Sequence, residues 1–435
     1  MKRLLISLTV AMSAWAQPET VDPELPDTLD LETALEFALD NNLSILQARE
    51  QIREQDGLIT EVRSVLVPNI SMSASYKVLD DDLVGIDQDD ESWAVSIGAR
   101  QTLYGGGGLR AAVRAQRSLE EAAVFQLESI VNSVILDVTV RFYDVLLARD
   151  SIEVEEQNVE LLEEQLQNVR NRFEAGTVSQ FEVLQAEVTL ANAQPALIRA
   201  KNNFRVAADE LRRATGYINI SPNNLTRVPE FIGDLVYMPV DADLVPALEA
   251  ALSNRPELKS LENLLTANTE RVAIARSDRR PDIALVGSYD VRRSGEASGT
   301  FDDPDHGWIV GIQSSWNIWD GNATRGRIVQ ARSQVRQAEL SLEQSQLDIE
   351  VEVRRALSGL QEADELAQAA AKVIDQAEEA LRLAQVRYDS GTSTYLDLLQ
   401  AQVALTQARN NQLRANYSHQ VARAQLDRAT GVRVQ

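Results

Sequence analysis

The chain repeats itself at a spacing of 215 residues, and this duplication constrains its fold more than any other feature. Arg172–Gly216 aligns without a gap on Arg387–Gly431, with 18 of 45 positions identical. Further upstream, Trp93 matches Trp308 at the same spacing. Solenoid units recur at roughly 20 to 50 residues. The much longer period therefore indicates two equivalent halves of one structure.

The composition excludes several classes of function. The 435 residues include no cysteine and only two histidines, and the net charge is −24 at pH 7. Nucleic-acid binding requires basic patches, so this acidic chain is not expected to bind nucleic acid. Without cysteine and with so little histidine, neither a metal site nor a Ser-His-Asp arrangement can be assembled. We expect no enzyme and no cofactor.

The first sixteen residues have the pattern of a secretory signal. Lys2 and Arg3 precede a short apolar run, Leu4–Met12, and Ala14–Ala16 supplies small residues for cleavage. The run is too short to span about 30 Å of hydrocarbon. No later segment is long and apolar enough to form a transmembrane helix. We expect an exported protein.

Each half contains one very long helix. Residues 108–173 lack proline and internal glycine and are rich in strong helix formers. Apolar residues recur at a mixed spacing of three and four, which predicts a continuous packing seam. The second half repeats this pattern over residues 325–388. About sixty-five residues at 1.5 Å each give a rod of roughly 100 Å, longer than a compact domain needs.

Each rod ends at a short tip from which a second helix returns. The tips, Ala175–Thr177 and Ser390–Thr392, each contain a glycine suited to a left-handed helix cap. Both returning helices begin with a Ser/Thr-x-x-acid pattern typical of a capping box. The pairs are Ser179 with Glu182 and Thr394 with Asp397.

Four segments alternate between apolar and polar residues, as strands do. They cover residues 69–79, 92–104, 282–292 and 307–319, and Trp93, Trp308 and Trp316 lie among their apolar positions. The pattern fits an ordinary antiparallel sheet and a transmembrane barrel equally well. Four strands cannot close a membrane barrel, and open edges are not tolerated in lipid. If the strands enter a membrane, two chains would supply eight strands and three would supply twelve.

These patterns divide the chain into five parts. We expect a signal peptide at 1–16, a first repeat at 17–216, an inter-repeat linker at 217–242, a second repeat at 243–431 and a tail at 432–435. The fold is expected to be mainly α with a small β part.

The duplicated tips, RFEAGTVSQFEVLQAE and RYDSGTSTYLDLLQAQ, together with the two strand pairs, resemble the outer-membrane efflux protein family of TolC-like channels. The resemblance covers nearly the whole exported chain. It implies a homotrimer with a twelve-stranded barrel in outer-membrane lipid and a long periplasmic α-helical barrel. It also implies an inner-membrane pump and a periplasmic adaptor, or membrane fusion protein, as partners. The chain would then be the passive exit duct of a tripartite efflux or type I secretion system.

The resemblance also implies roles for individual residues at the tips. Asp397 would belong to an acidic ring that binds cations and narrows the pore, with Glu182 as its equivalent and Tyr388 as a closing contact. The simpler interpretation is that both acids only cap helices. Some family members carry an arginine and a second aspartate where this chain has Ser393 and Gln400, so the bonding of the closed state is expected to differ or to be weaker. The residues expected to face the adaptor are Gly176, Thr177, Gly391 and Thr392, which could equally serve only to turn the chain.

Two further alternatives remain open at this level. The loops between strands are acidic, as in Asp80–Asp82, Asp87–Glu91 and Asp302–His306, and they could be solvated loops or a cation-binding mouth. The rival for the whole protein is a soluble periplasmic coiled-coil scaffold without a pore. That rival leaves the apolar strand faces with Trp93 and Trp308 unexplained.

Overall fold

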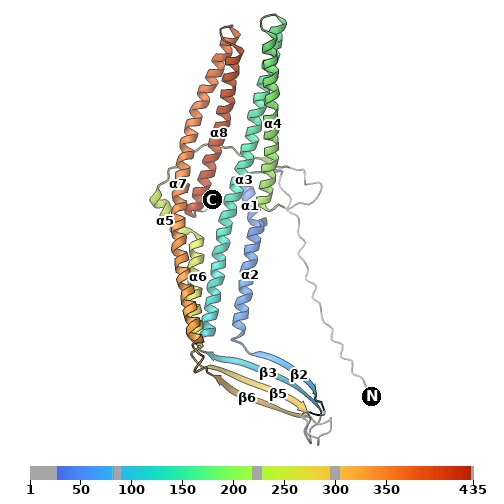
Figure 1. Cartoon of the computed structure of the whole chain (residues 1–435), viewed down its shortest axis with the longest axis vertical. Helices are drawn as coiled ribbons and strands as arrows, with labels where there is room; N and C mark the ends of the chain where they lie inside the picture. Colours follow the sequence, from blue (N-terminus) through green and yellow to red (C-terminus); the bar gives the residue numbers. More distant parts are fainter. Residues whose placement is uncertain (1–26, 81, 83–89, 218–227, 294–303, 433–435) are drawn as a thin grey trace, which may run out of the picture.

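The chain forms an elongated molecule with a curved sheet at one end and two helical hairpins at the other (Figure 1). This computed structural model describes residues 27–80, 82, 90–217, 228–293 and 304–432. The expected signal peptide, most of both acidic loops and residues 433–435 lie outside these ranges.

The two halves repeat the same order of elements. The first half comprises β1 Thr28–Leu29, α1 Leu31–Asn41, α2 Leu43–Ser64, β2 Asn69–Val78, β3 Glu91–Gly105, α3 Gly108–Glu174 and α4 Gln180–Thr215. The second half comprises β4 Glu230–Phe231, α5 Leu244–Asn254, α6 Pro256–Ser277, β5 Asp282–Arg293, β6 Asp305–Ser315, α7 Ala323–Asp389 and α8 Tyr395–Thr430.

The two long helices are confirmed. Helices α3 and α7 contain 67 residues each, and α4 and α8 contain 36 each. Both rods begin after a residue in the left-handed conformation, Gly107 at φ 89° and Asn322 at φ 73°. A left-handed residue reverses the chain sharply. Strand β3 is thereby connected to α3 through two residues, and β6 is connected to α7 through seven.

The four main strands form one antiparallel sheet in the order β2-β3-β5-β6, so the two halves meet at the β3–β5 pair. Strand β6 ends at Ser315, which corrects the strand expected over 307–319. Trp316 follows the strand, and its indole Nε1 donates to the carbonyl of Arg279 at 3.1 Å. Strands β2 and β6 form the two edges.

The register sorts side chains into an apolar and a polar face. One row across all four strands is apolar: Met72, Ile97, Tyr289 and Trp308. The next row is small or polar: Ser73, Ser96, Asp290 and Gly307. Because neighbouring rows point to opposite faces, one face of the sheet is apolar and the other is polar. Trp93 lies four positions before Ile97 and shares the apolar face.

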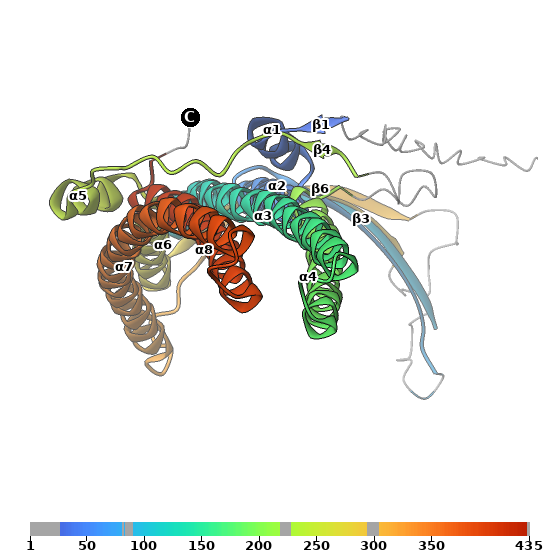
Figure 2. The same ribbon diagram turned by 90° about the horizontal axis from the view of Figure 1, so that it is seen from above.

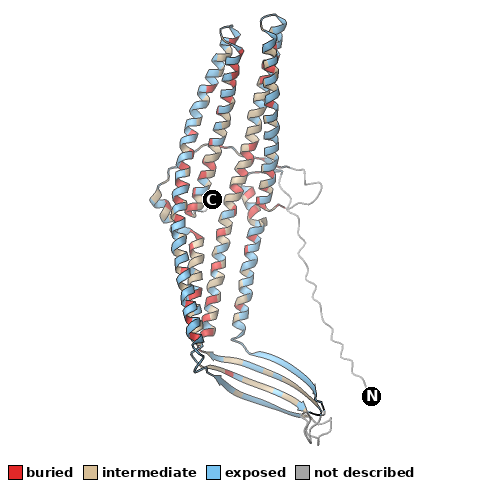
Figure 3. Cartoon of the chain, in the orientation of Figure 1, coloured by how far each residue is buried: buried red, intermediate tan, exposed pale blue. Residues whose placement is uncertain are grey.

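Beyond the sheet, four helices lie side by side as a curved layer in the order α4-α3-α8-α7 (Figure 2). Helix α3 packs against α4 of its own hairpin and α8 of the other half. Helices α2 and α6 extend this layer toward the sheet. Buried residues concentrate along these helices, whereas the sheet is largely exposed (Figure 3).

A belt covers the outer side of the helical layer at mid-height (Figure 2). It consists of α1, α5 and residues 228–243, in which β4 pairs in parallel with β1. Phe231 of the belt packs edge-on against Phe142 and Phe204, at centroid distances of 6.4 and 5.9 Å. The Arg149 guanidinium donates to the carbonyls of Phe231 and Gly233, both at 2.8 Å. The described part of the expected linker is thus fastened to the helices.

The belt also covers a buried histidine on α8. His419 is fully buried, and neither ring nitrogen has a hydrogen-bond partner among the described residues. Its ring packs edge-on against Tyr237 at 4.8 Å, and the Tyr237 hydroxyl donates to Asp364 of α7. Burial lowers the pKa of His419, Asp364 opposes this effect, and Arg423 adds to it. The folded protein therefore favours the neutral ring.

We predict that His419 makes the belt contact sensitive to acid. The pKa of His419 in the folded protein lies below the ordinary value of 6.5. The contribution of the neutral ring to the free energy of unfolding is therefore complete above pH 6.5 and is lost as the pH falls below 6.5. The midpoint of thermal unfolding should fall more between pH 7.5 and pH 5 in the wild type than in His419→Leu. His306→Gln is the matched control because His306 is exposed on β6. An equal fall in wild type and His419→Leu would contradict the prediction.

Candidate gate at the helical tips

Both tips are closed by the same hydrogen-bond pattern around a left-handed glycine. Gly176 has φ 76° and Gly391 has φ 73°. Thr177 N donates to the carbonyl of Arg172, and Thr392 N donates to that of Arg387, each at 2.9 Å. This is the Schellman arrangement, in which a glycine ends the helix without steric cost. The helix-capping role expected of both glycines is confirmed.

The two returning helices start differently although their sequence patterns match. Thr394 and Asp397 form a complete capping box at the start of α8. Ser179, at the equivalent position before α4, makes no side-chain cap hydrogen bond to the described residues. Only the second tip therefore has the reciprocal cap that the sequence predicts for both.

Asp397 is held by its own turn. One carboxylate oxygen, Oδ2, accepts from Thr394 N at 2.9 Å, from Thr394 Oγ1 at 2.7 Å and from Ser393 Oγ at 2.9 Å. These bonds, those of Thr394 first, lower the pKa of Asp397 below its ordinary value. The side chain is exposed, so it is a fixed negative charge at the surface of the tip at neutral pH.

Beside this cap, a cluster of five side chains joins the two hairpins. Tyr388 at the end of α7 donates its hydroxyl to Glu182 Oε2 of α4 at 3.4 Å. Arg172 of α3 places its guanidinium 4.8 Å from the centre of the Tyr388 ring and forms an ion pair with Asp389 at 2.5 Å. Tyr395 of α8 packs its ring 5.7 Å from that of Tyr388. Every helix of the two hairpins contributes to these contacts.

The two tyrosines of the cluster are shielded from solvent, whereas Asp389 is exposed. Tyr388 is 6% exposed and Tyr395 is 3% exposed. Burial, followed by the charge of Glu182, raises the pKa of Tyr388. Burial raises the pKa of Tyr395 to about 12, and its hydroxyl has no partner among the described residues. Both phenols therefore stay neutral, and Tyr388 acts as a hydrogen-bond donor between the hairpins.

The structure brings together only some of the residues singled out in the sequence. Tyr388 and Glu182 meet, whereas the hydrogen bonds of Asp397 are all made within its own tip. Trp93, Trp308 and Trp316 lie with the sheet, at the far end from the tips. Sequence reasoning missed Arg172 and Tyr395. The sequence offered one signal for Tyr395, because the equivalent position in the first half is occupied by Gln180 and the two halves differ there.

The acidic loops show no cation site where the structure describes them. Asp80, Asp82, Asp305 and His306 are exposed. Within the described ranges, no three His, Cys, Asp or Glu side chains lie close enough together to hold a metal ion. The remaining aspartates of these loops lie outside those ranges.

Three known proteins are similar to this chain along most of their length. The chain is similar to the alkaline protease secretion protein AprF of Pseudomonas aeruginosa, with 25% identity covering 80% of this chain and 71% of AprF. It is also similar to the cobalt-zinc-cadmium resistance protein CzcC of Cupriavidus metallidurans, with 25% identity covering 99% and 100%. The crystal structure of the Campylobacter jejuni CmeC outer membrane channel superimposes with a TM-score of 0.79, at 19% identity, covering 92% of this chain and 85% of CmeC.

The fold is that of outer-membrane efflux channels, mainly helical with a small sheet. The sequence profile of the family described as Outer membrane efflux protein matches residues 34–217 and 247–432, which is most of both halves. The chain belongs to this family, as its tips suggested, and it is an outer-membrane component of an efflux or secretion system.

The two tips offer a matched test of capping. Replacing Thr394 with Ala removes a side chain that caps α8, whereas Ser179→Ala removes one that makes no cap bond. A lost cap typically speeds local opening roughly fivefold. Hydrogen exchange of the backbone amides in the first turn of α8 should accelerate by that factor in Thr394→Ala. The amides in the first turn of α4 should be unaffected in Ser179→Ala, and equal acceleration at both tips would show that the second cap has no special role.

Proposed function

We propose that three copies of this chain form a passive exit duct through the outer membrane and the periplasm. The observation that carries the proposal is that one chain leaves open edges in both of its layers. The sheet ends at β2 and β6, and the helical layer ends at α4 and α7. Neighbouring copies would close both layers at once.

The sheet supports the proposal through its edges and its faces. An unpaired edge in lipid leaves backbone N–H and C=O groups without partners, at a cost of several kcal/mol each. Three copies supply twelve strands, enough to close a membrane barrel. The apolar row through Trp308 would face lipid, together with Trp93, and the polar row through Asp290 would face the pore. Trp316, just beyond β6, would lie at the periplasmic border of the membrane.

The helical layer supports the same closure. Exposed apolar side chains follow one stripe of α4, and another stripe follows α7. Soluble monomers rarely expose contiguous apolar surface of this kind. The residues of α4 are Phe181, Leu184, Val188 and Ile198, each more than half exposed. Those of α7 are Leu347, Val351, Leu366, Val373 and Val386. Contact between α4 of one copy and α7 of the next would cover both stripes.

Membership of the outer-membrane efflux family supports an orientation and partners for this closed assembly. The barrel would lie in the outer membrane and the helices would extend through the periplasm. The tips at Gly176-Thr177 and Gly391-Thr392 would then meet a periplasmic adaptor and an inner-membrane pump. Residues 1–16 would be removed on export, leaving repeats at 17–216 and 243–431 joined by 217–242. Relatives named for protease secretion and for metal resistance share the design, which fits selection of cargo by the pump.

The gate would combine the two sets of tip contacts. The Tyr388–Glu182 hydrogen bond holds the two hairpins of one chain together at rest, and an adaptor would open the tips by separating them. Asp397 of three chains would form an acidic ring around the pore entrance. The cap described above explains how this charge is held in place, so capping and gating are compatible.

The scaffold alternative does not account for the sheet. Among the described residues, no helix is long and apolar enough to span a membrane. A soluble scaffold would leave five large apolar side chains of the sheet in contact with water, each more than 60% exposed: Ile70, Met72, Trp308, Val310 and Ile312.

The state of assembly tests the proposed function first. Protein extracted in detergent from the outer-membrane fraction should have a protein-only mass of three chains by light scattering. The same particle in a planar bilayer should conduct ions. A monomer or dimer that is extracted in buffer without detergent would refute the duct and support the scaffold.

The gate predicts that removing the hydroxyl changes the conductance at only one of two neighbouring tyrosines. Tyr388→Phe removes the hydroxyl that reaches Glu182 and keeps the buried ring, so it should raise resting conductance several-fold. Tyr395→Phe is the matched control because the Tyr395 hydroxyl has no partner among the described residues.

The same bilayer recordings test the acidic ring. Asp397→Ala should weaken the block of conductance by divalent cations, whereas Asp375→Asn, which changes an exposed acid of α7 fourteen residues before the end of that helix, should not. Unchanged block in Asp397→Ala would refute the ring, and equal conductance of both tyrosine variants would refute the proposed closing contact.

A further inference from the structure

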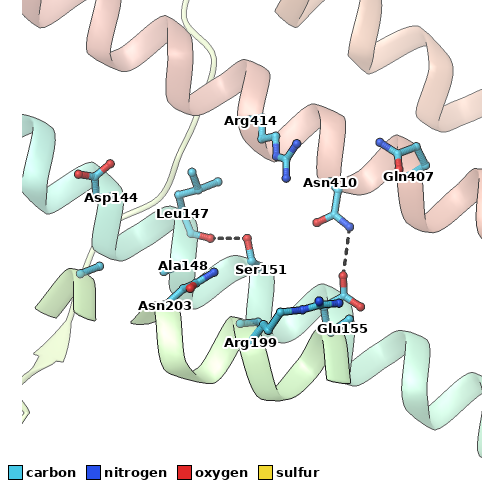
Figure 4. A pocket seen from close by; sticks show the side chains of 13 residues that line it. Asp144, Leu147, Ala148, Ser151, Glu155, Arg199, Asn203, Gln407, Asn410 and Arg414 are labelled. Carbon is cyan, nitrogen blue, oxygen red and sulfur yellow. Dashed lines mark hydrogen bonds between the residues drawn. The ribbon is translucent and has the colours of Figure 1, made fainter. Parts of the chain in front are cut away.

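A pocket of about 470 Å³ lies between α3, α4 and α8 at mid-height, away from the tips (Figure 4). Its lining is polar and includes two arginines, Arg199 of α4 and Arg414 of α8. Asp144 and Glu155 of α3 line it as well. The volume is in the range of small-molecule sites, roughly 300 to 1,000 Å³. All of the lining comes from one chain.

The acids of the pocket already have partners, whereas its arginines do not. Asp144 accepts from the Tyr417 hydroxyl at 2.7 Å and from Arg141 at 3.3 Å. Glu155 accepts from Asn410 Nδ2 at 3.3 Å, as Figure 4 shows. Neither Arg199 nor Arg414 forms a hydrogen bond or an ion pair with any described residue. Two guanidinium groups with free donors therefore line one polar pocket.

The pocket opens on the side of the helical layer opposite the belt. On α8, Asn416 donates to the belt carbonyl of Leu235, and Arg414 lies about 200° around the helix from it. On α3, Arg149 binds the belt, and Ser151 of the pocket lies about 200° away. This is the concave side of the layer in Figure 2. If the proposed trimer forms, the pocket faces the pore.

We propose that Arg199 and Arg414 form a binding site for a small oxyanion, a carboxylate or phosphate, on the wall of the duct. Guanidinium groups bind such oxyanions through paired, charge-assisted hydrogen bonds. The amides of Asn203 and Gln407, which also line the pocket, can donate to the same ligand. The chain as a whole is acidic, with a net charge of −24. Asp144 and Glu155 line the same pocket, so recognition of an anion would depend on the donors of the two guanidinium groups rather than on an excess of positive charge.

The position of the site on the duct wall rests on the proposed function, but binding requires only residues of one chain. The full chain, purified in detergent at low salt, is titrated by calorimetry with citrate and, separately, with inorganic phosphate. Arg199→Gln/Arg414→Gln should weaken binding of the preferred anion at least about tenfold, because each arginine supplies charge-assisted bonds. Tighter binding of citrate identifies a carboxylate site, and tighter binding of phosphate identifies a phosphate site.

The matched control removes the same charge elsewhere. Arg205→Gln/Arg382→Gln changes one arginine on α4 and one on α7, neither of which lines the pocket. Its affinity should stay within about twofold of the wild type. Equal affinity of the wild type and the pocket variant, or an absence of binding to the wild type at millimolar anion, would overturn the proposal. Arginine-dependent binding by a protein that never conducts would support the site and refute the duct, so the two failures can be told apart.

Discussion

The apolar seam of α3 is the constraint on which the rest of the structure depends. Val138, Phe142 and Val145 are almost completely buried where the belt crosses the rod. Nearer the tip, Leu162 and Val169 are buried against α4 and α8. A single helix of 67 residues has no stable position without such a seam, because most helical stability in proteins comes from packing of one apolar face. Since α3 packs against α8, its seam also joins the duplicated halves.

The halves have kept the same backbone but not the same chemistry at their tips. Both glycines close a Schellman turn, and the backbone of the two tips is therefore equivalent. The second half alone has a complete capping box and two buried tyrosines, whose counterparts in the first half are Phe173 and Gln180. Both halves have an acid at this position, Glu182 and Asp397, but only Tyr388 has a hydroxyl to donate across the hairpins. Its counterpart Phe173 has none, so the halves can form one such hydrogen bond and not two.

The features that the sequence predicted well are those set by local residues. The extents of α3 and α7 followed from composition and periodicity, and the tips followed from Gly176 and Gly391. The belt could not be predicted in this way. Arg149 holds it through the backbone carbonyls of Phe231 and Gly233, and because every residue has such a carbonyl, no sequence pattern marks these two. The end of β6 was missed because Trp316 and Ile318 continue the apolar alternation after pairing has stopped. The same Ser/Thr-x-x-acid pattern forms a full cap at Thr394 and no side-chain cap bond at Ser179, so the motif permits the cap without ensuring it.

Sheet and helices belong to one chain, so in the proposed assembly a single rotation would close both layers. With four strands and four hairpin helices per copy, the number of copies that completed the barrel would also complete the helical ring. Two copies would require the arc of α4-α3-α8-α7 to turn through half a circle, whereas three would require a third of one. Each copy would then present the concave side of its arc, with Arg199 and Arg414, toward the common axis. Closure would therefore convert one polar pocket into three that surround the path of the cargo.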